Sequence, residues 1–192
     1  MAAFLFNGAE EYSYKMLVEY INQHKKYFPL YKTHDIFAYF ENLIKAIVTN
    51  RPLVLLDSDL NPSEVAGVDE SQVNIAVQLP DYHFDDINSV VAALQKSSSE
   101  ITIFTSGTTG QPKKVVHSIE TLTRSVHLGD RYKGQVWAYA YNPTHMAGLQ
   151  VFFQAFENQN TLVNVFNMQR SDVYQKIAQY QITHISATPT FY

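Results

Sequence analysis

The apolar positions of the chain recur with two different periods, one typical of helices and one typical of strands. Apolar residues at helical spacing over 13–28 predict an amphipathic helix that Ser13 caps and Pro29 stops. A second helix with one apolar face is expected to begin at Thr33 or Asp35. The N-terminal fifth of the chain is therefore predicted to be mainly helical.

Short apolar runs bounded by polar turns predict a series of strands farther along the chain. These strands are expected over 53–56, 73–77, 101–104, 135–141, 161–166 and 182–185. Helical patterns separate most of them, over 85–94, 118–128, 146–156 and 171–180. Strands and helices that alternate with short links favour an α/β fold with a largely parallel sheet and flanking helices.

Composition narrows the class of protein. The chain has 192 residues, 46% hydrophobic and 17% charged, so it can bury a core and is not disordered. A net charge of −4 gives no basic footprint for nucleic acid or an anionic membrane. The absence of cysteine excludes disulfides, thiolate metal sites and a cysteine nucleophile from this chain. The histidines show no metal-ligand spacing with carboxylates, so no metal site is predicted.

Targeting signals bear on the location of the protein, and the aromatic content bears on its core. The N-terminus lacks the basic and apolar regions of a signal peptide, and no run reaches the length of a membrane span, so a cytoplasmic protein is expected. The chain holds 13 tyrosines and 12 phenylalanines, which favour a large core or an interface over an aromatic pocket.

The segment 104–114 has the densest run of glycine and hydroxyl residues, and it ends in two lysines. Its glycines allow close backbone approach, its hydroxyls and backbone N–H groups donate hydrogen bonds, and its lysines add positive charge. Such a loop suits a di- or triphosphate, although composition alone leaves a flexible linker as the alternative. If a strand follows, Lys113 and Lys114 point in opposite directions and only one of them faces the site. Neither the P-loop pattern nor the dinucleotide fingerprint is present.

The same segment carries a family resemblance. Residues 105–113 read T-S-G-T-T-G-Q-P-K and resemble the phosphate-binding motif T-S-G-[ST]-T-G-x-P-K-G of the adenylate-forming, or AMP-binding, superfamily. That superfamily includes acyl- and aryl-CoA synthetases, nonribosomal peptide adenylation domains and firefly luciferase. Lys114 departs from the motif, which has glycine there. Three later stretches are similar to family segments in the same order: 115–118 to V-x-H-[ST], 142–149 to P-x-x-H-x-x-G-L, and 183–192 to a strand with a proline-containing turn.

The resemblance implies a reaction and a set of site residues. A carboxylic acid and ATP give acyl-AMP and pyrophosphate with Mg²⁺, and a thiol of CoA or a carrier-protein pantetheine then takes the acyl group. The resemblance makes His145 and Lys113 the catalytic candidates, with His145 beside the acyl pocket. It assigns phosphate binding to Thr105, Ser106, Gly107, Thr108, Thr109, Gly110 and Lys113. Tyr141, Phe152 and Phe153 line the acyl pocket in one interpretation and pack in the core in the other.

The resemblance also implies that much of the family's machinery lies outside the chain. The adenine-stacking Tyr-Gly-x-Thr-Glu segment, the ribose-binding aspartate and the late lysine are absent from 1–192. We therefore expect one incomplete α/β domain over 1–192, the N-terminal portion of an AMP-binding domain, with no motif in 1–99 and the phosphate loop in 100–192. Such a fragment is expected to be inactive alone, and its uncovered apolar surface favours a homo-oligomer. The alternative is a non-enzymatic phosphate- or nucleotide-binding module that needs a partner.

Overall fold

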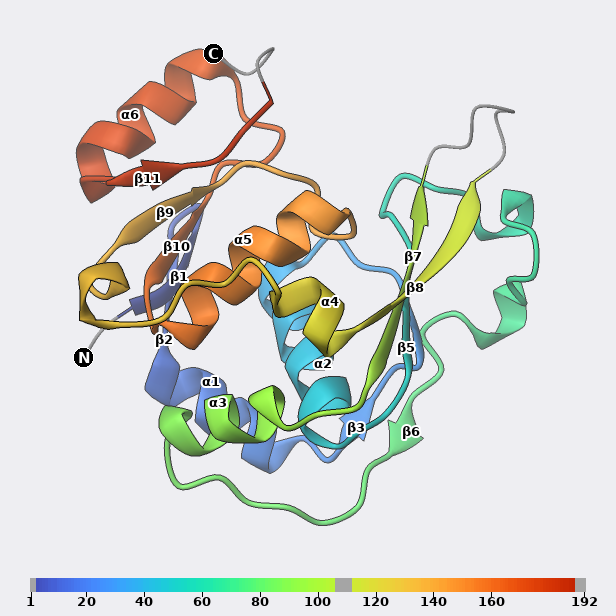
Figure 1. Cartoon of the computed structure of the whole chain (residues 1–192). Coiled ribbons are helices and arrows are strands. Elements are labelled where there is room, and N and C mark those ends of the chain that lie inside the picture. The colour runs from blue at the N-terminus through green and yellow to red at the C-terminus, as the bar shows by residue number, and fades with distance from the viewer. Residues whose placement is uncertain (1–2, 106–111, 189–192) are drawn as a thin grey trace. The chain divides into compact units, whose positions relative to one another are not determined.

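The computed structural model describes residues 3–105 and 112–188, and the chain divides into two compact units (Figure 1). The first unit combines the N-terminal segment through Leu17 with the segment from Thr123 onward. The second unit is the intervening segment, Val18–Leu122. Each unit has a sheet of its own, so each is described separately. The expectation of a single incomplete domain stays a prediction.

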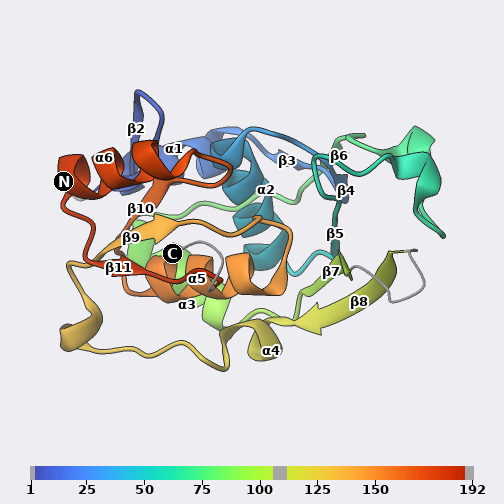
Figure 2. The same cartoon turned by 90° about the horizontal axis from the view of Figure 1, so that it is seen from above.

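The first unit is built on a five-stranded sheet with the order β11-β9-β10-β1-β2. All neighbouring strands are parallel except β1 and β2, which form an antiparallel pair. Helices α5 and α6 cover opposite faces of this sheet (Figures 1 and 2). The elements of the unit are β1 Ala3–Asn7, β2 Glu10–Ser13, the 3-10 helix η3 Asp130–Tyr132, β9 Val136–Tyr139, α5 Met146–Glu157, β10 Thr161–Asn164, α6 Arg170–Tyr180 and β11 His184–Ile185. The predicted α/β fold with a largely parallel sheet is confirmed.

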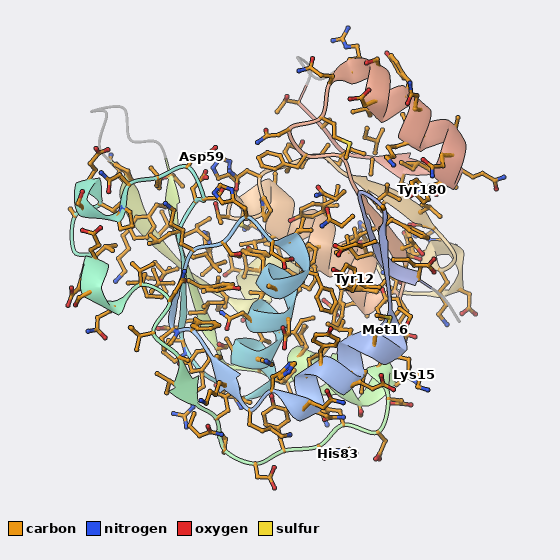
Figure 3. All side chains as sticks on the ribbon, turned by 180° about the vertical axis from the view of Figure 1, so that it is seen from behind. Tyr12, Lys15, Met16, Asp59, His83 and Tyr180 are labelled. Atoms are coloured by element: carbon orange, nitrogen blue, oxygen red, sulfur yellow. The ribbon has the colours of Figure 1, made fainter. Side chains whose placement is uncertain are left out.

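Side chains of the strands pack on both faces of this sheet, and a register shift between Ala3 and Leu5 in β1 lets Phe4 and Phe6 lie on opposite faces. Ala138 and Val163 are buried against Val173 of α6. Tyr180 lies at the end of the same helix (Figure 3). Its ring centroid is 4.4 Å from that of Phe6. The opposite face carries an aromatic core with α5, in which the rings of Phe4 and Phe156 are 6.0 Å apart. The abundant aromatic residues of this unit therefore serve mainly as core, as expected.

Strands β1 and β2 are the elements that the hydrophobic pattern did not predict. Phe4 and Leu5 are fully buried, and β1 pairs in parallel with β10 in the middle of the sheet. The chain turns at Gly8, which has a φ of 63°, a value that glycine adopts without steric cost. Asn7 pairs with Glu10, so the loop is Gly8-Ala9, and glycine at the first position of a two-residue loop is a hairpin signal in the sequence.

The start of α5 requires a glycine. Asn142 makes a turn in which its side-chain oxygen accepts hydrogen bonds from the backbone and hydroxyl of Thr144 at 2.9 and 2.8 Å. His145 then occupies the N-cap, and its backbone N–H donates to the Asn142 carbonyl at 3.1 Å. A Cβ at Gly148 would overlap that same carbonyl oxygen. The glycine thus lets the first turn of α5 pack directly on the preceding loop.

The second unit contains a four-stranded sheet with the order β4-β5-β7-β8 and a two-stranded sheet of β3 and β6. Strands β4, β5 and β7 are parallel, and β8 is antiparallel to β7. Helix α1, Tyr14–Gln23, begins in the first unit and ends in the second. The other elements are β3 Lys26–Tyr27, β4 Leu30–Tyr31, α2 Ile36–Val48, β5 Leu53–Leu55, the 3-10 helices η1 Pro62–Glu64 and η2 Glu70–Gln72, β6 Val77–Gln78, α3 Ile87–Gln95, β7 Glu100–Thr105, β8 Lys113–Ser118 and α4 Ile119–Thr123.

Helix α2 is the central helix of the second unit. Asp35 is its N-cap and accepts hydrogen bonds from the backbone N–H groups of Phe37 and Ala38, which decides between the two predicted starts. Phe40, Leu43, Ile44 and Ile47 are fully buried on it. Burial extends around most of the helix, since Phe37, Tyr39 and Ala46 are buried as well, and it stabilises the unit through the hydrophobic effect.

One buried charge cluster also belongs to α2. The Lys45 ammonium lies 2.6 Å from a carboxylate oxygen of Glu41, and His24 Nδ1 lies 3.3 Å from the same oxygen. The Lys45 and Glu41 side chains are only 5% and 15% exposed. Burial lowers the pKa of Lys45, and Glu41 counteracts that effect by favouring the charged amine. Lys45 therefore depends on Glu41 for its charge in the core.

Several element boundaries differ from those predicted. The predicted helix 13–28 ends at Gln23, because the chain then enters β3. The predicted strand over 73–77 is reduced to β6, since η2 precedes it. The predicted helix 118–128 ends at Thr123, although Ser118 accepts a capping hydrogen bond from the Thr121 N–H at 3.2 Å.

A substitution tests the close contact at the start of α5. We expect Gly148→Ala to lower the free energy of unfolding by about 2 kcal/mol, because the new methyl group overlaps the Asn142 carbonyl and has no room to relax. Chemical denaturation monitored by circular dichroism measures the change. Gln175→Ala, at an exposed position of α6, is the control and should change stability by less than about 0.5 kcal/mol. Equal stabilities of the two variants would contradict the contact.

A second substitution tests the buried cluster. Glu41→Gln keeps the shape of the side chain but leaves the buried Lys45 charge without its counter-charge, so a loss of about 2 kcal/mol is expected. Adding Lys45→Met should restore most of that loss, because no buried charge then remains. The exposed pair of Lys133 and Asp130 is the control, and Asp130→Asn should cost less than about 0.5 kcal/mol. A Glu41→Gln effect as small as that of the control would refute the role of Glu41.

Candidate active site

The predicted phosphate loop joins two strands of a β-hairpin. Strand β7 enters the loop at Thr105 and β8 leaves it at Lys113, and these two residues are direct partners in the antiparallel ladder. The pairing continues without interruption to Glu100 and Ser118. The two ends of the loop are thus held together by a ladder of backbone hydrogen bonds, which gives the loop a defined base.

The register of the hairpin distinguishes the two lysines. Residues that face each other in an antiparallel pair lie on the same face, so Lys113 shares a face with Thr105, and Lys114 shares the other face with Phe104. Phe104 is buried in a cluster with Leu56 and Val65. The predicted alternation of the lysine directions is therefore present, and Lys113 stands on the same face as the threonine that opens the motif.

The electrostatics at the base of the loop suit an anion. Both lysines and Thr105 are exposed, and neither lysine forms an ion pair with any residue that the structure describes. Of the two lysines, Lys113 shares the face of Thr105, and an ammonium beside a hydroxyl is a suitable set of donors for phosphate oxygens. The remaining predicted phosphate ligands lie outside the described residues and stay predictions: Ser106, Gly107, Thr108, Thr109 and Gly110.

The second predicted catalytic residue lies in the first unit. His145 is exposed at the N-cap of α5, and its side chain does not cap the helix. Its spacing to Gly148 and Leu149 matches the family pattern, but Pro143 precedes it by two residues where the pattern has three. Gly148 allows the first turn of α5 to pack on the Asn142 carbonyl, and it thereby sets the helix start at which His145 lies. The catalytic role of His145 stays a prediction.

A cavity of about 510 Å³ opens on the α5 side of the first-unit sheet. It extends beside β9 and β11 and is bounded by the N-terminal half of α5 and by the segment before β9. Its lining is neutral, since it contains no Asp, Glu, Lys or Arg among the described residues: Ser125, His127, Tyr132, Gln135, Trp137, Tyr141, Ala147, Gln150, Val151, Gln154, His184, Ile185 and Ser186. Tyr141 and Ser186 follow β9 and β11, at the ends of parallel strands where open α/β sheets commonly bind ligands.

Two sets of hydrogen bonds hold the walls of this cavity. The indole N–H of Trp137 donates to the side-chain oxygen of Gln135 at 2.9 Å. The side chain of Gln154 on α5 accepts from the backbone N–H of His127 at 2.8 Å and donates to its carbonyl at 3.1 Å. The segment before β9 is thereby fastened to α5. The cavity is a preformed feature of the first unit.

The three residues that the sequence offered for the acyl pocket are divided between the cavity and the core. Tyr141 lines the cavity. Phe152 and Phe153 are fully buried in the core, as the core-packing interpretation predicted. His145 does not belong to the lining residues, while Ala147, two positions later, does. Sequence reasoning placed Trp137 in the core and His184 in the core or on the surface. Their adjacency depends on the parallel pairing of β9 with β11, for which the sequence has no local signal.

The described residues also limit what else the site can hold. Within 3–105 and 112–188 no three His, Asp or Glu side chains gather to hold a metal ion. The described residues at the base of the loop, Thr105, Lys113 and Lys114, offer hydroxyl and amine donors that suit phosphate oxygens. They include no carboxylate that could bind Mg²⁺. No helix in the described part of the chain combines the length and apolar character needed to cross a bilayer.

The chain shares its fold with solved adenylate-forming enzymes. o-Succinylbenzoate CoA synthetase of Bacillus subtilis, solved with an acyl-adenylate intermediate, is 17% identical with a TM-score of 0.65, covering 98% of this chain and 59% of that one. The N-terminal domain of FACL13 from Mycobacterium tuberculosis is 14% identical with a TM-score of 0.68, covering 99% and 60%. The N-terminal subdomain of Klebsiella oxytoca NpsA is 12% identical with a TM-score of 0.66, covering 96% and 56%.

Sequence comparison agrees with the structural likeness. The chain is 29% identical to the 2-succinylbenzoate–CoA ligase of Bacillus subtilis (strain 168) over 106 residues, which are 53% of this chain and 22% of that relative. The chain thus spans less than two thirds of these relatives. A model of the AMP-binding enzyme family matches residues 39–192, which include the loop, the hairpin, α5 and the cavity. The chain therefore belongs to the AMP-binding enzyme family.

Proposed function

We propose that this chain is the N-terminal part of an ATP-dependent carboxylic acid ligase of the acyl-CoA synthetase type. The full-length protein joins a carboxylic acid to AMP, releases pyrophosphate, and passes the acyl group to a thiol of CoA or of a carrier-protein pantetheine. The names of its relatives support this class, because the Bacillus subtilis protein is a CoA ligase and its solved complexes contain an acyl-adenylate or ATP with magnesium.

The β7–β8 hairpin is the observation that carries the proposal. It places Thr105 opposite Lys113 at the base of a loop whose sequence matches the family's phosphate motif. In the proposed reaction a carboxylate oxygen bonds to the α-phosphorus of ATP while the bond to the β-phosphate oxygen breaks, and pyrophosphate leaves with that electron pair. Charge grows on the departing oxygens, so preorganised cations and donors near them lower the barrier.

Specific residues have specific roles in this proposal. Lys113 neutralises the pyrophosphate as it forms, and Thr105 with Ser106, Thr108 and Thr109 orients its oxygens. Backbone N–H groups at Gly107 and Gly110 complete the cradle, since glycine permits the close approach that bulky residues block. Bound Mg²⁺ would add charge neutralisation at the phosphates. His145 is the residue proposed to lie beside the acyl-binding pocket and to help shape it.

The neutral cavity of the first unit is the proposed site for the body of the acid. Its volume of about 510 Å³ falls within the range of small-molecule sites. The Bacillus subtilis relative is named for 2-succinylbenzoate, and the Klebsiella oxytoca neighbour is solved with a 3-hydroxyanthranilyl analogue. A small organic acid is therefore the proposed substrate.

Substitution of the two lysines tests the proposed role of the hairpin. In the full-length protein, Lys113→Ala should lower the rate of acid-dependent ATP–pyrophosphate exchange by about 100-fold, because one charge-stabilising donor is lost in the transition state. Lys114→Ala is the matched control and should change the rate less than about threefold, since its side chain lies on the opposite face of the hairpin. Equal losses in the two variants would remove Lys113 from its proposed role.

The isolated chain provides a separate prediction. The purified 192-residue chain should show no ATP–pyrophosphate exchange, because the resemblance assigns adenine, ribose and carboxylate contacts to segments that it lacks. The measurement uses radiolabelled pyrophosphate with a panel of carboxylic acids and the full-length protein as positive control. Exchange by the chain alone would overturn the expectation that it is inactive. Inactivity of the full-length protein as well would favour the non-enzymatic binding module.

A further inference from the structure

We propose that the cavity of the first unit selects acids with a flat aromatic body over acids with a saturated one. This inference deepens the proposed function and rests on it for the identity of the cavity as an acid site. It is drawn from the shape, charge and unpartnered polar groups of the cavity lining.

Flat rings form two walls of the cavity. Trp137 and His184 are register partners on β9 and β11, and their rings stack at 4.9 Å with an interplanar angle of 26°. His127 and Tyr132 stack at 5.6 Å with an angle of 19° in the segment before β9. Both pairs line the cavity. A planar guest gains offset-stacked or edge-to-face contacts with such rings, and a puckered aliphatic guest does not.

The indole ring of Trp137 is held by its neighbours in the sheet and by one hydrogen bond. Trp137 occupies one row of the sheet, between Leu162 of β10 and His184 of β11. Its indole N–H is already satisfied by Gln135. In this orientation the ring presents apolar surface, not a polar edge, to a guest. A preformed surface costs little conformational entropy when a guest binds.

The lining also contains two polar side chains, Gln150 and Tyr141, that could bind a polar group of a guest. Neither the carboxamide of Gln150 nor the hydroxyl of Tyr141 makes a hydrogen bond to any residue in the described part of the chain, and both are only partly exposed. These groups can recognise a polar substituent on a ring. The neutral lining offers no counter-charge for a carboxylate, so it suits the body of the acid and not its reacting group.

Small residues on α5 leave room for the guest. Ala147 and Val151 lie one turn apart on the helix and both face the cavity. A larger side chain at Ala147 would occupy space that the guest needs. The position therefore offers a substitution that fills the cavity without touching the ring pairs or the hydrogen bonds of Gln154.

Trp137 is the only tryptophan of the chain, so its fluorescence reports on this cavity directly. The purified 192-residue chain is excited at a wavelength that benzoate does not absorb and titrated with benzoate, cyclohexanecarboxylate and octanoate. Benzoate should give a saturable change with an affinity about fivefold or more above those of the two saturated acids, as expected for one stacking interaction. Octanoate binding as tight as benzoate, or no saturable change with benzoate, overturns the proposal.

Two pairs of variants locate the binding. Ala147→Leu should weaken benzoate binding about tenfold or more, whereas Ala178→Leu, at an exposed position of α6, should leave it unchanged. Gln150→Leu should weaken 4-hydroxybenzoate more than benzoate, and Gln175→Leu is its control. Circular dichroism verifies the folding of each variant. Equal binding by Ala147→Leu and Ala178→Leu would place the benzoate outside the cavity and refute the proposal.

The fluorescence titration tests the cavity assignment, and the exchange assay tests the adenylation reaction, so each proposal can be refuted without the other. Aryl-selective fluorescence without exchange in the full-length protein would leave the cavity assignment standing and remove the adenylation reaction. Exchange in the full-length protein that prefers saturated acids, combined with no benzoate binding, would remove the cavity assignment and leave the reaction standing.

Discussion

The antiparallel pairing of β7 with β8 is the constraint on which the functional interpretation depends. The ladder joins Thr105 to Lys113 and thereby fixes which residues form the base of the loop. It also fixes direction, because a strand turns successive side chains to opposite faces. The sequence contains two adjacent lysines, and only the register shows that Lys113 lies on the face of Thr105 while Lys114 lies on the face of Phe104. A shift of the pairing by one residue would exchange their positions.

The first unit shows how a sheet prepares a binding surface through non-local pairing. Trp137 and His184 are far apart in the sequence and become neighbours because β9 and β11 are parallel strands in the same sheet. The hydrogen bonds between Gln154 and His127 fasten the segment before β9 to α5. These contacts form a cavity whose walls do not depend on a ligand. Its neutral lining contrasts with the cationic base of the loop in the second unit, so the two features differ in the chemistry that they can bind.

Local signals accounted for much of the secondary structure. Ser13 and Asp35 were predicted as helix starts, and each accepts a hydrogen bond from a backbone N–H of the following turn. Boundaries were less well predicted where tertiary contacts interrupt a periodic pattern, as in the segment 24–28, which enters β3 instead of continuing α1. Strand β1 was missed although Gly8 at the first position of its two-residue loop is a local turn signal, because its partner β10 lies more than 150 residues away.

The sequence by itself determined the family motif, its order relative to the histidine and glycine of α5, and the α/β class, because these depend on local residue types and on periodicity. Tertiary structure alone decided the orientation of Lys113, the clash that requires Gly148, and the lining of the cavity by Trp137, His184 and Gln150. Each of these depends on register and on packing between segments distant in the chain, and side-chain chemistry read along the sequence does not specify which strands become neighbours.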